Sequence, residues 1–348
     1  MYHLGSTCWR PPILRQTGGL LQSEFSWSDT FVNSRRSYRT SSLPALCALA
    51  LATLLLLMPV PTLGRAGCAL LDLVHVPLFA LLSALAYTLF VGNQTRHRWL
   101  FTVVIWCFLA SFGIVAEWLQ AHVGRSASAH DAFANAAGAA AGLFWVIGRR
   151  SPHPARRVAM NVGVVGLILA AFTYPLLVLL DVYLVHRSFP VLASFEQPLE
   201  LWRWTPLNAK LQRSPKYATN GSWSLRIDWH VAKYPAAALS LPARDWTPYE
   251  ELVFDIVWDA SDSVATTETL LVIVKVQDEQ HNDEYQDRFH QQVTLRPGQP
   301  AEVRVPLMRV AYAPQDRVMD MSRIDKVELF TVRPQTRLTL YLDNMRLE

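Results

Sequence analysis

Polar and ionisable side chains are concentrated in one stretch between two apolar segments, residues 117–142. The stretch reads EWLQAHVGRSASAHDAFANAAGAAAG, and its candidate functional residues are Glu117, Gln120, Arg125, Asp131 and Asn135. A carboxylate can act as a general base or a metal ligand, and a guanidinium can hold a phosphate. Ionisable groups beside membrane spans are costly to maintain, which makes them candidates for function.

Three pairs of polar residues in this region have helical spacing. They are Asp72 and His75, Glu117 and Gln120, and Asp131 and Asn135. Residues three or four positions apart project from one stripe of a helix, so each pair can face the same neighbours. If the ends of these helices meet on one membrane face, the pairs and Arg125 form a single cluster. The alternative is a salt-bridge network that only fixes helix packing.

The 348 residues divide by composition into an apolar part and a part of ordinary soluble composition. Residues 1–42 are polar, and we expect a cytoplasmic tail with little fixed structure. Five membrane spans are expected after it, at about 43–63, 70–91, 99–119, 131–147 and 158–184. All five lysines follow the last span, so the net charge of +4 does not indicate nucleic-acid binding.

The arginines in the loops predict how these spans are oriented. The N-terminal tail and the loops near residues 96–98 and 149–157 are rich in arginine, whereas the other short loops hold few. The positive-inside rule places the arginine-rich side in the cytoplasm. Five spans then put the C-terminal domain outside, in the periplasm or the extracellular space. We therefore expect a multi-pass membrane protein, with its polar cluster on the outer face.

The expected fourth span contains small residues at a spacing typical of close helix packing. Gly138 and Gly142 are separated by three alanines, and such a pattern lets two helix backbones approach closely. The fourth helix is therefore predicted to be buried in the bundle.

The polar and small residues described above resemble a pattern of the VanZ-like family of small bacterial membrane proteins. The elements of the pattern are Asp72 with His75, Glu117 with Gln120, Arg125, Asp131 with Asn135, and Gly138 with Gly142. The resemblance covers about residues 43–150. It departs from the family at Leu73, where a lysine is frequent, and at Val76, where an aromatic residue is frequent. The resemblance implies a four-helix membrane domain in the cell envelope and a connection with glycopeptide-antibiotic tolerance. Residues 151–190 would form a cytoplasmic loop and the fifth span.

From about residue 191 the chain changes to short alternating segments separated by turns. Seven segments are typical of strands, at 224–229, 251–258, 269–276, 291–295, 301–306, 326–332 and 338–342. Asn220-Gly221 and Pro297-Gly298 are among the turns between them. Many short strands at this spacing predict an all-β sandwich over residues 191–348.

Details of this domain resemble a jelly-roll carbohydrate-binding module. They include Phe195-Glu196, the run at 220–226, Asp245-Trp246 and the closing Tyr341-Leu342-Asp343-Asn344. The resemblance implies an extracytoplasmic domain that binds a glycan.

A glycan site needs aromatic faces for the sugar rings and fixed polar groups for the hydroxyls. The candidate platforms are Trp202, Trp204, Trp229, Tyr234, Trp258 and Tyr285. The candidate polar partners are Asp278, His281, Asn282, Asp287 and Arg288. The alternative is that most of these aromatic residues belong to the core and that Asp287 and Arg288 brace the sheet.

One cofactor is predicted for the sandwich. Glu196 and Asp343 would lie side by side if the first and last strands pair, and their carboxylates could then hold a structural Ca²⁺. The alternative is a pair of solvated acids at the sheet edge.

The sequence favours a protein that acts on, or docks to, an envelope glycan or a lipid-linked glycan. One alternative is an enzyme at the membrane face, with Glu117 or Asp131 as base or metal ligand, His75 as acid or base, and Arg125 as a clamp for a lipid-linked phosphate. Another alternative is an assembly protein whose sandwich binds a protein partner.

Overall fold

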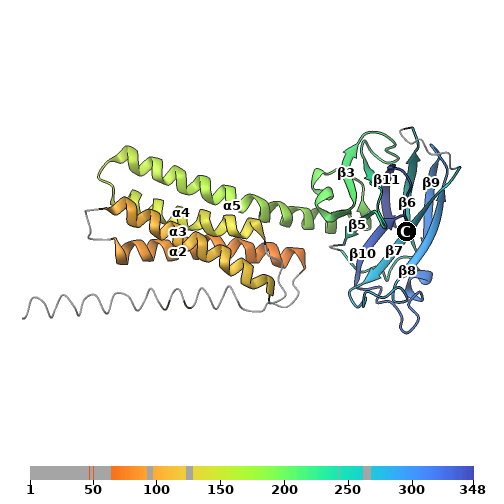
Figure 1. The fold of residues 1–348 in the computed structure, drawn as a ribbon, viewed down its shortest axis with the longest axis horizontal. Coiled ribbons are helices and arrows are strands. Elements are labelled where there is room, and N and C mark those ends of the chain that lie inside the picture. The colour runs from red at the N-terminus through yellow and green to blue at the C-terminus, as the bar shows by residue number, and fades with distance from the viewer. Residues whose placement is uncertain are drawn as a thin grey trace, which may run out of the picture.

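The computed structural model describes residues 47, 50, 64–91, 97–122, 128–241, 243–261 and 268–348. A helical bundle is followed by a β-sandwich, and one long helix leads from the first into the second (Figure 1). The expected span at 43–63 lies outside the described residues, apart from residues 47 and 50, and so does Arg125.

Four helices form the described part of the bundle. They are α2 (Arg65–Phe90), α3 (Arg98–His122), α4 (Ala129–Arg150) and α5 (Pro154–Ser188). Each is long and apolar enough to cross a membrane, and together they correspond to the expected second to fifth spans. Pro154 occupies the first helical position of α5, where its missing N–H costs nothing.

Helix α4 packs against α2, α3 and α5. Its glycines contact the backbone of α2 directly: a Cβ on Gly138 would lie 2.5 Å from the carbonyl oxygen of Val76. A Cβ on Gly142 would overlap the carbonyl oxygen of Ala80. The predicted close approach at the small residues is therefore confirmed, and α4 is the most buried of the four candidate spans.

The sandwich consists of two antiparallel sheets. One sheet has the order β3-β4-β11-β6-β9, with β1 also paired to β11. Its strands are β1 (Val191–Ala193), β3 (Ala209–Ser214), β4 (Ser224–Trp229), β6 (Glu251–Asp259), β9 (Pro300–Pro306) and β11 (Leu338–Leu347). A short helix, α6 (Leu307–Ala311), follows β9.

The second sheet has five strands in the order β2-β5-β10-β7-β8. They are β2 (Trp204–Leu207), β5 (Ala236–Ser240), β7 (Leu270–Asp278), β8 (Phe289–Leu295) and β10 (Ile324–Phe330). A 3-10 helix, η1 (Pro198–Arg203), precedes β2. The core lies between the two sheets, and Trp229, Trp246 and Trp258 are its largest fully buried side chains.

All seven predicted strands are present, as β4 and β6 to β11. Strands β1, β2, β3 and β5 were not predicted. Strand β5 reads AAALS, and alanine is depleted in strands, so its sequence gives little indication of its structure.

The bundle and the sandwich are joined by contacts of α5. Asp181 of α5 accepts a hydrogen bond of 3.0 Å from Arg65 at the start of α2, and it lies 3.3 Å from Nε of Arg203 in η1. One and a half to two turns earlier, Tyr174 stacks on Trp202 with ring centroids 5.6 Å apart. The sandwich is therefore attached at the end of the bundle where α2 begins.

Candidate functional site

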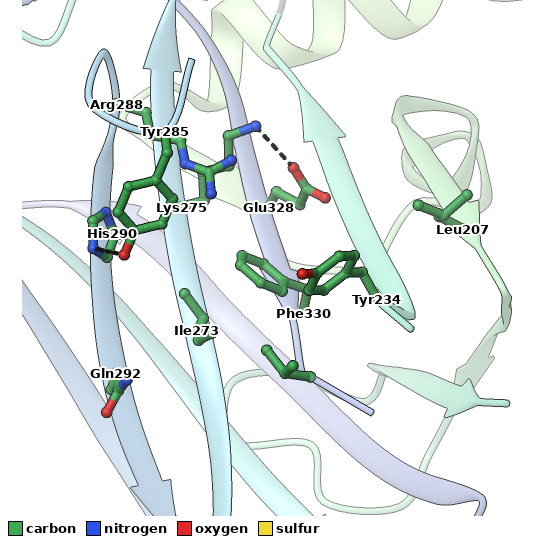
Figure 2. Close-up of a pocket in the computed structure, with 11 residues that line it drawn as sticks. Leu207, Tyr234, Ile273, Lys275, Tyr285, Arg288, His290, Gln292, Glu328 and Phe330 are labelled. Carbon is green, nitrogen blue, oxygen red and sulfur yellow. Dashed lines mark hydrogen bonds and ion pairs between the residues drawn. The ribbon is translucent and has the colours of Figure 1, made fainter. Parts of the chain in front are cut away.

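The five-stranded sheet has a groove on its outer face, with a volume of about 510 Å³ (Figure 2). Strand alternation explains which side chains line it. In β7, Val272, Val274 and Val276 point into the core, so Ile273 and Lys275 point outward. His290 and Gln292 alternate in the same way on β8.

Strand register aligns these outward residues in two rows that cross the sheet. One row is Ala238, Glu328, Lys275 and His290, and the other is Ala236, Phe330, Ile273 and Gln292. Strand β5 contributes only alanine to these rows, so no bulky side chain of β5 stands beside Glu328 or Phe330. Leu207 and Tyr234 line the groove beyond β5, and Tyr285 and Arg288 line it beside β8.

Polar contacts fix the groove's charged and aromatic groups. Lys275 forms an ion pair of 3.4 Å with Glu328, and the Tyr285 hydroxyl lies 2.6 Å from Nε2 of His290 (Figure 2). The Arg288 guanidinium lies 4.9 Å from the centroid of the Tyr285 ring. Burial, together with Arg288, lowers the pKa of His290, so this imidazole is neutral at pH 7. Burial also lowers the pKa of Lys275, although Glu328 opposes the shift.

This arrangement has the two elements that a sugar site requires. Tyr285 is 61% exposed and Tyr234 is 46% exposed, so both offer aromatic surface to a ligand. The groove is also lined by an amide, a neutral imidazole and an ion pair, all of which can bond to hydroxyl groups. Three of these residues were predicted from the sequence, namely Tyr234, Tyr285 and Arg288. The others were not: Lys275, His290, Gln292, Glu328 and Phe330. Two features of the sequence could have indicated these residues. One is the lysine within the apolar run of β7, and the other is the alternation of side chains in β8.

The remaining predicted polar partners do not line the groove. Arg317 forms hydrogen bonds of 2.6 and 2.7 Å to Asp278, and of 2.5 and 3.0 Å to Asp287. The backbone N–H of Asn282 donates to Asp287, and the His281 ring lies 2.7 Å from the Asp287 carbonyl oxygen. These residues brace the loop between β7 and β8, with Arg317 rather than Arg288 as the partner of Asp287.

Most of the predicted tryptophan platforms are part of the core. Trp204, Trp229 and Trp258 are at most 4% exposed, which excludes them from stacking on a ligand in this fold. Strand alternation turns all three inward, and burial of a large aromatic side chain contributes strongly to stability. Trp202 is 46% exposed but stacks on Tyr174 of α5, away from the groove.

Glu196 and Asp343 hold one turn of the sandwich from two sides. Strand β1 pairs with β11, and Glu196 lies three residues after the end of β1. Glu196 accepts backbone hydrogen bonds from Ser222 and Trp223, at 2.7 and 2.8 Å, and Asp343 accepts them from residues 219 and 220 at 2.6 and 3.0 Å. Gly221, with φ of +89°, allows this turn, because a Cβ there would lie 2.5 Å from the Glu196 carboxylate. A calcium ion at this position stays a prediction.

In the bundle, the structure brings together three of the predicted cluster residues. His75 of α2, Glu117 of α3 and Asp131 of α4 each offer one ligand atom, and these atoms lie within 4.8 Å of one another. All three are at most 5% exposed. Gln120 is 1% exposed one turn after Glu117, and Asp72 is half-buried one turn before His75.

The start of α4 explains how Asp131 reaches this position. Ser128 caps the helix: its Oγ accepts hydrogen bonds from the N–H groups of His130 and Asp131. The N–H of Ser128 lies 3.4 Å from the Glu117 carboxylate, which links the end of α3 to the start of α4. The His130 ring contacts Tyr174 with centroids 4.7 Å apart, so the cluster and the sandwich lie at the same end of the bundle.

Several solved carbohydrate-binding structures are similar to part of this chain in fold. A family 11 carbohydrate-binding module from Clostridium thermocellum, in complex with a β-1,3-1,4-mixed-linked tetrasaccharide, has a TM-score of 0.34 and 17% identity, over 45% of this chain and 93% of that one. A xylan-binding CBM22 domain has a TM-score of 0.30 and 19% identity, over 44% and 90%. An exo-β-agarase has a TM-score of 0.35 and 18% identity, over 45% of this chain. The match covers only 24% of the length of the agarase.

No protein-family model matches this chain, and no curated protein sequence matches it. The VanZ-like resemblance of residues 43–150 therefore stays a hypothesis.

Proposed function

We propose that this chain is a membrane-anchored protein that binds a glycan in the groove of its five-stranded sheet. The observation that carries the proposal is the groove itself, which is lined by two exposed tyrosines and by several hydrogen-bonding groups. The rows of lining residues cross four strands, from β5 to β8. Strands lie about 4.8 Å apart, so the rows extend over about 14 Å, enough for a short oligosaccharide.

The charge of the groove favours an acidic glycan over a neutral one. Its charged lining residues are Lys275, Arg288 and Glu328, one positive charge in excess. Acid groups on the sugar would pair with this excess charge, and the attraction would weaken with added salt.

The membrane setting supports an envelope glycan or a lipid-linked glycan as the target. The four apolar helices are proposed to span the inner membrane, with the sandwich outside. At the opposite end of the bundle lie Arg98, Arg149, Arg150, Arg156 and Arg157, as the positive-inside rule expects of a cytoplasmic face. The VanZ-like pattern of the helices is consistent with an envelope role.

The test is a binding screen of the full chain in lipid nanodiscs against acidic and neutral bacterial polysaccharides. We expect binding to at least one acidic glycan, and at least a tenfold loss in Tyr285→Ala and in Tyr234→Ala. Tyr312→Ala is the matched control, because Tyr312 is 70% exposed and lines no part of the groove. Absence of binding across the panel, or equal binding by all three variants, would contradict the proposal.

A further inference from the structure

We propose that His75, Glu117 and Asp131 bind a divalent metal ion, with zinc as the best-suited probe. This site is separate from the groove, and the proposal does not depend on glycan binding. The three residues come from α2, α3 and α4, and their ligand atoms lie within 4.8 Å of one another. Ligands held about 2.0–2.2 Å from one tetrahedral zinc ion are about 3.4 Å apart. Side-chain shifts of about 1 Å would therefore bring these three atoms onto one ion.

The burial of these residues agrees with an ion between them. Glu117 and Asp131 are 4% and 5% exposed, and His75 is 4% exposed. Two carboxylates held this close repel one another when both are charged, and removal from water increases the cost. An ion with two positive charges offsets both effects at once.

A second observation concerns the residue that orients His75. Nδ1 of His75 lies 2.8 Å from Oδ1 of Asn135. An amide oxygen can only accept, so Nδ1 carries the proton and Nε2 keeps the lone pair that a metal needs. A polar partner on the second ring nitrogen is the usual arrangement of a metal-binding histidine.

Asn135 is itself fixed in place. It is fully buried, and a Cβ on Gly113 of α3 would lie 2.7 Å from the Asn135 Cβ. Its Nδ2 has no hydrogen-bond partner among the described residues. A buried donor without an acceptor is costly. Packing against Gly113 therefore fixes the amide with its Oδ1 on His75.

The donor set indicates the class of metal. One imidazole nitrogen and two carboxylate oxygens suit zinc or another divalent transition metal, whereas calcium prefers six to eight oxygen ligands and copper(I) prefers sulfur. Three protein ligands leave a fourth position open for water or for an oxygen of a bound molecule, which is the pattern of catalytic rather than structural zinc sites.

The test measures metal binding by the purified full chain in detergent, with the affinity tag removed. After chelator treatment and reloading with Zn²⁺, we expect one tightly bound zinc per chain by elemental mass spectrometry. Glu117→Gln, Asp131→Asn and His75→Gln should each weaken zinc binding by at least 100-fold. Asn135→Ala should weaken it by about 10–100-fold, the usual effect of losing a ligand-orienting partner. His122→Gln is the matched control, because His122 lies at the same end of α3 but is exposed.

A measurement on the unaltered chain covers the case in which the variants fail to fold. Reloading with Co²⁺ should give the visible absorption of a four-coordinate ion, and excess zinc should remove it. A wild-type chain that binds no zinc above the detergent blank and shows no cobalt absorption would overturn the proposal. Folded ligand variants that retain wild-type zinc affinity would overturn it as well.

Discussion

Oδ1 of Asp181 lies 3.3 Å from Nε of Arg203, and this ion pair joins α5 to the first helical turn of the sandwich. The two side chains are 1% and 6% exposed. Arg65 at the start of α2 also pairs with Asp181, so three segments distant in sequence meet at one carboxylate. This carboxylate therefore contributes to the junction between the bundle and the sandwich.

Replacement of Asp181 should loosen the junction. Asp181→Ala leaves Arg203 buried beside a missing partner, and loss of one partner of a buried pair costs about 3–5 kcal/mol. We expect a protease to cleave the variant faster between α5 and the sandwich in detergent. Mass spectrometry of the fragments measures the rate and the site of cleavage. Asp316→Ala, on an exposed loop, is the control. Identical cleavage rates in both variants would show that the junction is held by other contacts.

The loop between β7 and β8 should depend on Arg317. Its guanidinium bridges Asp278, which is 1% exposed, and Asp287. Arg317→Met retains the aliphatic stem but leaves two carboxylates without their cation, which should lower the free energy of unfolding of the sandwich by about 3–5 kcal/mol. Unfolding in urea, monitored by tryptophan fluorescence, measures this free energy. Arg309→Met is the control, because Arg309 is exposed. A change below about 1 kcal/mol would contradict it.

The same cluster should make the sandwich sensitive to acid. Burial alone would raise the pKa of Asp278, but hydrogen bonds from Arg317 outweigh it and hold the pKa below 3.8. Hydrogen bonds from Arg317 likewise lower the pKa of Asp287. Below pH 3.8 the unfolded chain therefore binds more protons than the folded one. This stabilisation is complete above that pH and is lost as the pH falls through the lowered values.

Unfolding measured between pH 7 and pH 2 tests this sign. Stability of the wild type should fall steeply below about pH 4. Arg317→Met should flatten that dependence, because the variant loses the Arg317 hydrogen bonds that lower the pKa of Asp278 and of Asp287. A steeper acid loss in the variant than in the wild type would refute the assignment.

Contact between α2 and α4 should not tolerate side chains at the small positions. Gly142→Val places methyl groups against the backbone at Ala80, so the two helices must separate. We expect the free energy of unfolding to fall by about 3 kcal/mol or more, and the melting temperature in detergent to fall with it. Gly166→Val of α5 is the matched control, because a Cβ there meets nothing within 4 Å. Equal melting temperatures for the two variants would exclude this packing.

Filling the groove should block its ligand without disturbing the core. Ile273 lies between Phe330 and Gln292 in one of the two rows, with its side chain on the outer face. Ile273→Trp should therefore reduce glycan binding at least tenfold at unchanged melting temperature. Leu271→Trp alters the same strand two residues earlier, outside the groove, and should bind normally. Unaltered binding by Ile273→Trp would place the glycan elsewhere.

Sequence periodicity was sufficient for four of the five expected apolar helices and for seven strands, because each carries its own pattern. It failed at β5, where alanines show no alternation between sheet faces. It also could not separate core tryptophans from exposed ones: Trp229 and Trp202 are alike in type, and their burial depends on which sheet covers them. The pairs on α2, α3 and α4 were identified from helical spacing. Which of their atoms meet depends on helix packing at Gly113, Gly138 and Gly142.

Helix α5 is a single element of 35 residues. At about 1.5 Å per residue it is about 52 Å long, whereas the hydrocarbon core of a bilayer is about 30 Å thick. In a membrane, about 20 Å of its total length would lie outside the lipid tails, and Asp181 near its C-terminal end is held by Arg65 and Arg203. If the groove binds a glycan as proposed, this junction would hold the glycan at a fixed height and angle above the bilayer. The protein would thus set the distance between the glycan and the membrane.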